Sequence, residues 1–375
     1  MSQTLLQELS NRDLDWLMTT GRRRRVEADR LLVRAGQEIS AFYILIEGIL
    51  TISVPQNEDN ILDRAFAALE DQATWERDII ELKSGDIAGE EFLIKTGMVA
   101  NNVRTKVPSE VLIIPPEKLK LKLQQDIGFA ARFYRGVALL LTERLLKLTN
   151  KLRTTRSNFA STQSRDVLFA FGRLHDSDLD WLISYGNCQQ FPAGSTLLEE
   201  GKPAETLYLL LNGLAKVAIA QTEINPLDLA FAALGTIKTD GLGKEIAIIH
   251  PGEFIGEMPF GEMRLASSTV YAVEDSQVLA IPIHSLKLKL QQDLGWASRF
   301  EAVVATLAGS RFQDTITRLG YGRGFYSSGQ TLSQNCSYED ELDFESLDNL
   351  NLAGSRFRWL LDRLQVLNQN NLVGI

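Results

Sequence analysis

The sequence predicts an α+β chain made of two copies of one domain, each a small β-barrel or roll flanked by helices. An octapeptide, LKLKLQQD, begins at Leu119 and begins again at Leu286. A repeat of this length is too long for a solenoid, so each copy must be a whole domain with its own core. Within each copy, short extended runs are separated by glycines, which is typical of a small barrel or roll.

The two copies correspond well beyond the octapeptide. DLDWL starts at Asp13 and returns at Asp178, while from Gly85 and Gly252 onward the second copy has gained two residues, in what we expect to be a tolerant loop. These correspondences predict a first domain at 1–158 and a second at 172–320. A flexible acidic linker at 321–354 and a C-terminal amphipathic helix at 355–369 are expected to follow.

Composition places the chain among ordinary globular proteins. Of its 375 residues, 45% are hydrophobic and 23% are charged, and no apolar run approaches the roughly 18 to 20 residues that span a bilayer. The N-terminus lacks the basic start and apolar core of a signal peptide, so a cytoplasmic location is expected. The two cysteines, Cys188 and Cys336, suggest neither a disulfide framework nor a metal site. The net charge of −9 disfavours attraction of nucleic acid to the whole surface.

Helices are predicted before the first barrel strands. Residues 5–18 carry Leu6, Leu9, Leu14 and Leu17 at helical spacing. Ser10 stands where its hydroxyl would cap the start of a second short helix.

Two strands are predicted in the run FYILIEGILTISV at residues 42–54. Gly48 divides the run, and Gly36 precedes it at another position where a turn requires positive φ. After Gly48, apolar residues alternate with Thr51 and Ser53. This alternation predicts a strand with one face in solvent.

A long amphipathic helix is predicted to close each domain. Leucines at 141, 145, 148 and 152 mark it in the first copy, and the second repeats the pattern more weakly with Ala308, Phe312, Thr315 and Leu319. Such a helix could fold back on its own roll or form the seam of a homodimer. The first interpretation is favoured.

The order of these features resembles the cyclic nucleotide-binding domain of catabolite activator proteins and protein kinase A regulatory subunits. The first copy shows LLVRAGQEISAFYILIEGILTISV and GDIAGEEFLI, and the second shows TLLEEGKPAETLYLLLNGLAKVAI and PGEFIGEMPF. The resemblance covers about 300 of the 375 residues. It implies two cyclic nucleotide-binding-like β-rolls of the double-stranded β-helix (jelly-roll) type, each flanked by helices.

The resemblance also implies a phosphate cassette in each copy, at Gly89 with Glu90 and at Gly256 with Glu257. In the family, the glycine lets the backbone approach the ligand, a helix start binds the phosphate, and the carboxylate accepts the ribose hydroxyl. The ligand implied is a cyclic nucleotide, cyclic AMP or cyclic GMP. As an alternative, both glutamates could simply cap helix N-termini, where a carboxylate is favourable.

The family arginine, about ten residues after the glycine, is missing from both copies. Val99 and Ala266 occupy its place. Loss of one charge-assisted partner of a buried phosphate costs roughly 2 to 5 kcal/mol, which turns a micromolar site into one of about 0.1 mM or weaker. In the second copy, Arg264 could reach inward, and Ser267 and Ser268 could add hydroxyl donors to an anion.

No residue pattern indicates catalysis. The three histidines are scattered, and neither cysteine has a candidate base nearby in the sequence. The four arginines at 22–25 could meet phosphate groups or an acidic partner, or could simply form a solvated strand edge.

The tail is acidic and then amphipathic. Six acidic residues crowd into positions 339–348, and no Lys or Arg occurs between Arg323 and Arg356. Beyond them, an apolar stripe of Phe357, Leu360, Leu361, Leu364 and Leu367 is predicted opposite Arg356, Arg358 and Arg363. This helix could dock on a partner or on the chain's own roll. The tail leaves no clear room for a helix-turn-helix, so DNA is not expected as a partner.

Two functions follow from these observations. The first is a non-catalytic regulatory or scaffold protein whose two degenerate domains bind another protein. Its duplicated layout is similar to that of cyanobacterial bacteriocin-type transport-associated proteins, which implies an export-system component as partner. The second is a sensor in which domain 2 binds a cyclic nucleotide or another anion. No catalytic residue and no metal ligand is assigned.

Overall fold

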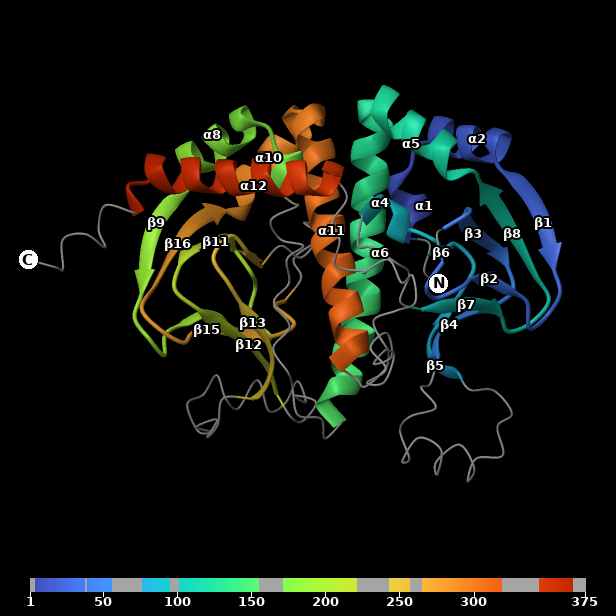
Figure 1. Ribbon diagram of the computed structural model, residues 1–375, viewed down its shortest axis with the longest axis horizontal. Coiled ribbons are helices and arrows are strands. Elements are labelled where there is room, and N and C mark those ends of the chain that lie inside the picture. Colours follow the sequence, from blue (N-terminus) through green and yellow to red (C-terminus); the bar gives the residue numbers. More distant parts are fainter. Residues whose placement is uncertain are drawn as a thin grey trace, which may run out of the picture. The chain divides into compact units, whose positions relative to one another are not determined.

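The structure is a computed structural model that describes residues 4–37, 39–55, 76–94, 101–154, 171–220, 243–256, 265–318 and 344–366. The chain divides into two compact units. Unit 1 comprises Met1–Leu148 and Ser298–Ser346, and unit 2 comprises Thr149–Ala297 and Leu347–Ile375. Each unit contains a β-roll flanked by helices (Figure 1).

The roll of unit 1 consists of two four-stranded antiparallel sheets, ordered β1-β8-β3-β6 and β2-β7-β4-β5. Its strands are β1 (Arg22–Val26), β2 (Leu31–Val33), β3 (Phe42–Glu47), β4 (Leu50–Pro55), β5 (Glu76–Leu82), β6 (Ile87–Ala88), β7 (Asn102–Thr105) and β8 (Ser109–Ile114). Gly48 separates β3 from β4 with a φ of 107°, and Gly36 has a φ of 73°, so both predicted turns are confirmed.

Unit 2 repeats this topology strand for strand, with sheets ordered β9-β16-β11-β14 and β10-β15-β12-β13. The strands are β9 (Asn187–Phe191), β10 (Thr196–Leu198), β11 (Thr206–Asn212), β12 (Ala215–Ile219), β13 (Lys244–Ile249), β14 (Phe254–Ile255), β15 (Thr269–Ala272) and β16 (Ser276–Pro282). The register repeats as well, because Arg22 lies opposite Ile113 and Asn187 lies opposite Ala280. The predicted fold class of two jelly-roll-like domains flanked by helices is confirmed.

Helices precede and follow each roll. They are α1 (Thr4–Glu8), α2 (Asn11–Thr20), α4 (Glu91–Ile94), α5 (Pro116–Gln125) and α6 (Ile127–Thr154), then α8 (Asp176–Tyr185), α10 (Ile283–Gln292), α11 (Leu294–Arg318) and α12 (Phe344–Arg363). The predicted cap at Ser10 is confirmed: its hydroxyl accepts from the Asp13 amide, and the Asp13 carboxylate accepts from the Ser10 amide.

The repeated octapeptide forms a helix that leads into the closing helix of each copy. Its final aspartate, Asp126 or Asp293, accepts a hydrogen bond from a backbone amide in the first turn of α6 or α11. The same aspartate pairs with Lys122 at 2.7 Å or with Lys289 at 2.8 Å. The octapeptide therefore fixes the joint between two helices in both copies.

Strand β4 differs from the prediction of one solvent-exposed face. Thr51 is 2% exposed and Ser53 is fully buried, and the apolar residues Leu50, Ile52 and Val54 that alternate with them are also buried. The Ser53 hydroxyl donates to Glu76, which also accepts from Asn102 and pairs with Arg104 at 2.6 Å. The Thr51 hydroxyl is buried without a hydrogen-bond partner. The alternation of residue types therefore indicates polarity and not exposure.

The closing helices are more deeply buried than an amphipathic helix on a surface. In α11 every residue at 301–310 is buried, and in α6 every residue at 136–142 is buried. From Ser298 onward α11 belongs to unit 1, although the repeat assigns it to the second domain. The boundaries of the sequence repeat therefore differ from the boundaries of the compact units. A helix apolar on all sides needs more partner surface than one roll provides.

Helix α12 packs on unit 2. Phe357 contacts Phe171 edge-on at 5.5 Å between ring centroids, and Phe171 stacks on Phe254. The Arg356 guanidinium donates to Asp176 at 3.0 Å and to the carbonyl of Gly172 at 3.0 Å. Of the two predicted positions for this helix, the chain's own roll is the one observed. Arg356 therefore lies at the contact and not on the opposite face.

The bounds of α12 correct the predicted boundary. The helix begins at Phe344, within the stretch that the sequence predicts as a linker to 354. Residues 321–343 of the predicted linker, and Leu367 of the predicted stripe, lie outside the described residues. No helix within the described ranges is long and apolar enough to cross a membrane.

Glu301 of α11 provides a test of the closing-helix packing. The residue is 3% exposed, and one of its carboxylate oxygens lacks a hydrogen-bond partner. Burial raises the pKa of Glu301 from 4.5 to about 7, with Arg135 opposing the shift and Glu8 adding to it. Because the pKa of Glu301 is higher in the folded state, this carboxyl group loses its proton at lower pH in the unfolded state. The free energy of unfolding therefore falls as the pH rises from about 4.5 to 7.

We expect Glu301→Gln to match the wild type near pH 4.5 and to be more stable by up to about 3 kcal/mol at pH 8. Hydrogen exchange of α11 peptides across this pH range measures the difference. Exposed Glu274→Gln is the control and should show no such trend. An equal effect of Glu301→Gln at both pH values would contradict the buried, unpaired carboxyl.

Leu360 tests the docking of α12. It is fully buried in unit 2, whereas Leu352 on the same helix is 42% exposed. We expect Leu360→Ala to destabilise this docking by about 2–5 kcal/mol and Leu352→Ala by less than about 0.5 kcal/mol. Limited proteolysis and hydrogen exchange at 344–366 measure both. Equal protection in the two variants would contradict the observed packing.

Candidate functional site

The first cassette position begins where β6 ends. Gly89 has a φ of 81°, and a Cβ there would lie 2.5 Å from the carbonyl oxygen of Ala41. Gly256 has a φ of 83°, and its Cβ would lie 3.1 Å from the carbonyl oxygen of Thr206. Both glycines are therefore required by the backbone alone, with or without a ligand.

Glu90 forms a buried ion pair with Arg144 of helix α6. The guanidinium also donates to the carbonyl of Ile87 on β6. The Arg144 and Glu90 side chains are 3% and 5% exposed. The carboxylate that would receive a ribose hydroxyl is thus occupied by the chain's own arginine, and it does not cap helix α4 either.

A second carboxyl group lies beside this pair. Glu91 is 7% exposed, and burial together with the neighbouring Glu90 carboxylate raises its pKa to about 8. Glu91 is therefore mostly protonated at neutral pH. Among the described residues, Arg144 is thus shared by two adjacent carboxyl groups.

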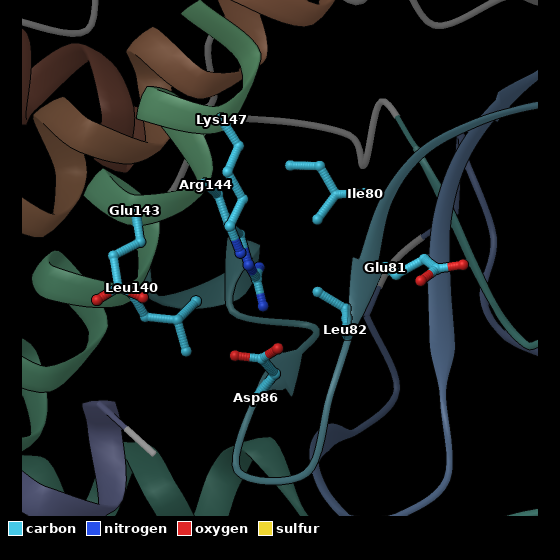
Figure 2. A pocket seen from close by; sticks show the side chains of 8 residues that line it. All are labelled: Ile80, Glu81, Leu82, Asp86, Leu140, Glu143, Arg144 and Lys147. Atoms are coloured by element: carbon cyan, nitrogen blue, oxygen red, sulfur yellow. The ribbon is translucent and has the colours of Figure 1, made fainter. Parts of the chain in front are cut away.

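Arg144 also borders a small cleft on unit 1. Figure 2 shows its side chain extending from α6 toward Asp86 of the β5–β6 turn, while Glu81 points away. The remaining lining residues are Ile80, Leu82, Leu140, Glu143 and Lys147. Asp86 accepts a hydrogen bond from the Lys83 amide at 2.7 Å, so it holds the turn in place. The described residues contain no group of three or more metal-ligating side chains.

The second cassette position is described only in part. Ser267 and Ser268 are half-buried just before β15. Ala266 stands at the family arginine position, is 5% exposed, and exchanges backbone hydrogen bonds with Gly201 and Lys202. Glu257 and Arg264 lie outside the described residues, as does Val99 of the first copy.

Sequence reasoning missed Arg144 and Glu91. The family spacing points to a residue about ten positions after the glycine, whereas Arg144 lies 54 residues after Glu90 on a different element. One signal was present: Arg144 interrupts the apolar stretch of α6, and Arg311 occupies the equivalent place in α11. A shared arginine within a closing helix could have been recognised as a candidate partner for the cassette carboxylate.

The Arg144–Glu90 pair can be tested by a double-mutant cycle. Each single replacement, Arg144→Leu or Glu90→Leu, should destabilise unit 1 by about 3–5 kcal/mol because the other charge stays buried without its partner. The double variant should recover most of this loss. Hydrogen exchange of peptides from β6 and α6 measures each variant in the full chain. Additive single effects would contradict a direct pair.

Parts of the chain are similar to known proteins and to one protein family. Residues 188–293 match the family model of the cyclic nucleotide-binding domain. The chain is 28% identical over 148 residues to the cAMP-activated global transcriptional regulator CRP of Escherichia coli O6:H1, covering 39% of this chain and 60% of that protein. It is 27% identical over 111 residues to the cyclic AMP receptor protein of Thermus thermophilus, covering 30% and 44%. The chain thus spans 60% or less of the length of these two relatives.

Solved structures include similar chains. The regulatory domain of Toxoplasma gondii PKA with cAMP matches at 16% identity and a TM-score of 0.25, covering 78% of this chain and 89% of that one. A cyclic nucleotide-binding domain from Methylobacillus flagellatus matches at 20% identity and a TM-score of 0.32, covering 47% and 81%. The family match thus falls within the second copy, where residues 188–293 are similar to the cyclic nucleotide-binding domain.

Proposed function

We propose that this chain is a non-catalytic regulatory protein in which domain 1 serves as a protein-interaction module and does not bind a cyclic nucleotide. The observation that carries the proposal is the buried pair of Arg144 and Glu90. A nucleotide would have to displace Arg144 to reach the carboxylate. It would then find Glu91 beside the phosphate and no family arginine to neutralise it.

A second candidate function assigns ligand binding to domain 2. The family model matches residues 188–293 and so falls on the second copy, and relatives of the chain are named for cAMP. The residues that would hold a cyclic nucleotide or another anion are Gly256, Glu257, Arg264, Ser267 and Ser268. This candidate makes domain 2 a sensor while domain 1 remains a scaffold.

The proposed partner is a protein and not DNA. The described helix after α11 is α12, and it packs on its own unit through Phe357 and Arg356. A helix held in this way does not offer its apolar face to a DNA-binding arrangement. An export-system component remains part of the proposal on the resemblance alone.

Titration calorimetry of the full chain with cyclic AMP and with cyclic GMP tests the proposal. We expect no more than one ligand per chain, and none at domain 1. Two ligands per chain would overturn the closed cassette of domain 1, and one ligand would support the sensor function of domain 2.

A matched pair of variants assigns any binding to its domain. Ala266→Arg restores the family arginine in copy two and should strengthen binding about tenfold or more, because it adds a charge-assisted partner to the phosphate. Arg144→Leu combined with Glu90→Leu removes the pair from copy one and should leave the stoichiometry unchanged. If that double variant abolished the wild-type binding, the ligand site would lie in domain 1.

A further inference from the structure

Strand β1 presents four consecutive arginines at the edge of a sheet. In the described part of the chain β1 pairs only with β8, so its other edge carries unpaired backbone groups. Arg22, Arg23, Arg24 and Arg25 are all exposed. An exposed row of backbone donors and acceptors is a template for an added strand.

These arginines have no acidic partner among the described residues. The nearest side-chain contact is from Arg23 to the sulfur of Met18, at 4.0 Å. Glu110 lies opposite Arg25 on β8, but no ion pair joins them. Four positive charges on one strand of a chain with net charge −9 form a concentrated local field.

The fold does not require this charge. The equivalent strand of unit 2, β9, has the same position in its sheet and the same register against β16. There the four positions are Asn187, Cys188, Gln189 and Gln190, which are also exposed. A charge that only kept the edge from aggregating would be needed on β9 as much as on β1.

The geometry of a strand decides what kind of partner fits. Successive side chains point to opposite faces, so Arg22 and Arg24 lie on one face and Arg23 and Arg25 on the other. A membrane surface or a nucleic-acid duplex could meet only one pair at a time. An added strand with carboxylates on both of its faces could meet all four, while its backbone completed the edge of the sheet.

We infer that β1 is a docking edge for an extended acidic segment of a partner protein, which adds to the sheet as a strand beside it. This inference names the partner chemistry of the interaction module proposed above and rests on that proposal. Nucleotide binding and peptide binding are measured separately, so either can fail without the other.

The test uses fluorescence anisotropy of the full chain with a labelled Glu-rich peptide in which Val and Thr are interspersed. The docking variant is Arg22→Asn, Arg23→Ser, Arg24→Gln and Arg25→Gln, which follows the uncharged pattern of β9. The control variant, Arg30→Gln, Arg34→Gln, Lys83→Gln and Lys118→Gln, removes the same charge from exposed positions elsewhere in unit 1. Thermal melts confirm that both variants fold.

We expect the docking variant to lose binding about tenfold or more and the control variant to lose less than about twofold. A peptide N-methylated on alternate residues should also bind at least about tenfold more weakly, because it cannot complete a strand ladder. Equal loss in both variants, or unchanged binding of the methylated peptide, would overturn the inference. Tighter binding to anionic vesicles or duplex DNA than to the peptide, lost in the docking variant, would assign the edge to those partners instead.

Discussion

The buried ion pair between Arg144 and Glu90 connects the three parts on which unit 1 depends. Arg144 belongs to the closing helix, Glu90 stands at the start of the short cassette helix, and Ile87, whose carbonyl also accepts from Arg144, belongs to the roll. The two terminal nitrogens of this one guanidinium therefore tie the closing helix to both the sheet and the cassette. The local arrangement of the candidate site follows from that requirement.

The same fold carries different chemistry in its two copies. Strand order and register repeat, and the octapeptide joint keeps both its lysine–aspartate pair and its helix cap. The two copies differ at positions that this shared framework does not hold. The four arginines of β1 correspond to uncharged residues in β9. Glu143 beside Arg144 is replaced by Ser310 beside Arg311. Framework positions are constrained by packing in both copies. Edge and cassette positions are not, so they could acquire separate roles.

The sequence predicts the framework well because its signals are local. Glycines at 36 and 48 mark turns that need positive φ, and Ser10 marks a helix start, since each depends on neighbouring residues only. The burial of Ser53 could not be predicted, because its partner Glu76 belongs to another strand. The start of α12 at Phe344 was missed because acidic residues dominate that stretch of sequence.

The sequence predicts where the candidate site lies in the chain, but not which residues its side chains contact. Gly89 and Gly256 lie at the ends of the expected strands with the expected backbone conformation, but the state of the site depends on a residue far away in the chain. No spacing rule around Gly89 points to Arg144, because the contact depends on how α6 packs against β6. Tertiary packing therefore decides whether a cassette is open or closed, and local sequence cannot.

The free energy needed to separate Arg144 from Glu90 determines how weakly a ligand would bind domain 1. Separation of a buried ion pair costs about 3–5 kcal/mol, and each 1.4 kcal/mol is a factor of ten in affinity. A ligand with micromolar intrinsic affinity would therefore bind domain 1 only at about 0.2 mM to several mM. Unless the ligand brought an opposite charge for each separated partner, Glu90 would remain an unpaired anion facing a phosphate. A closed pair of this kind favours a fixed surface over a ligand-responsive one, and a fixed surface suits the docking edge that we propose at β1.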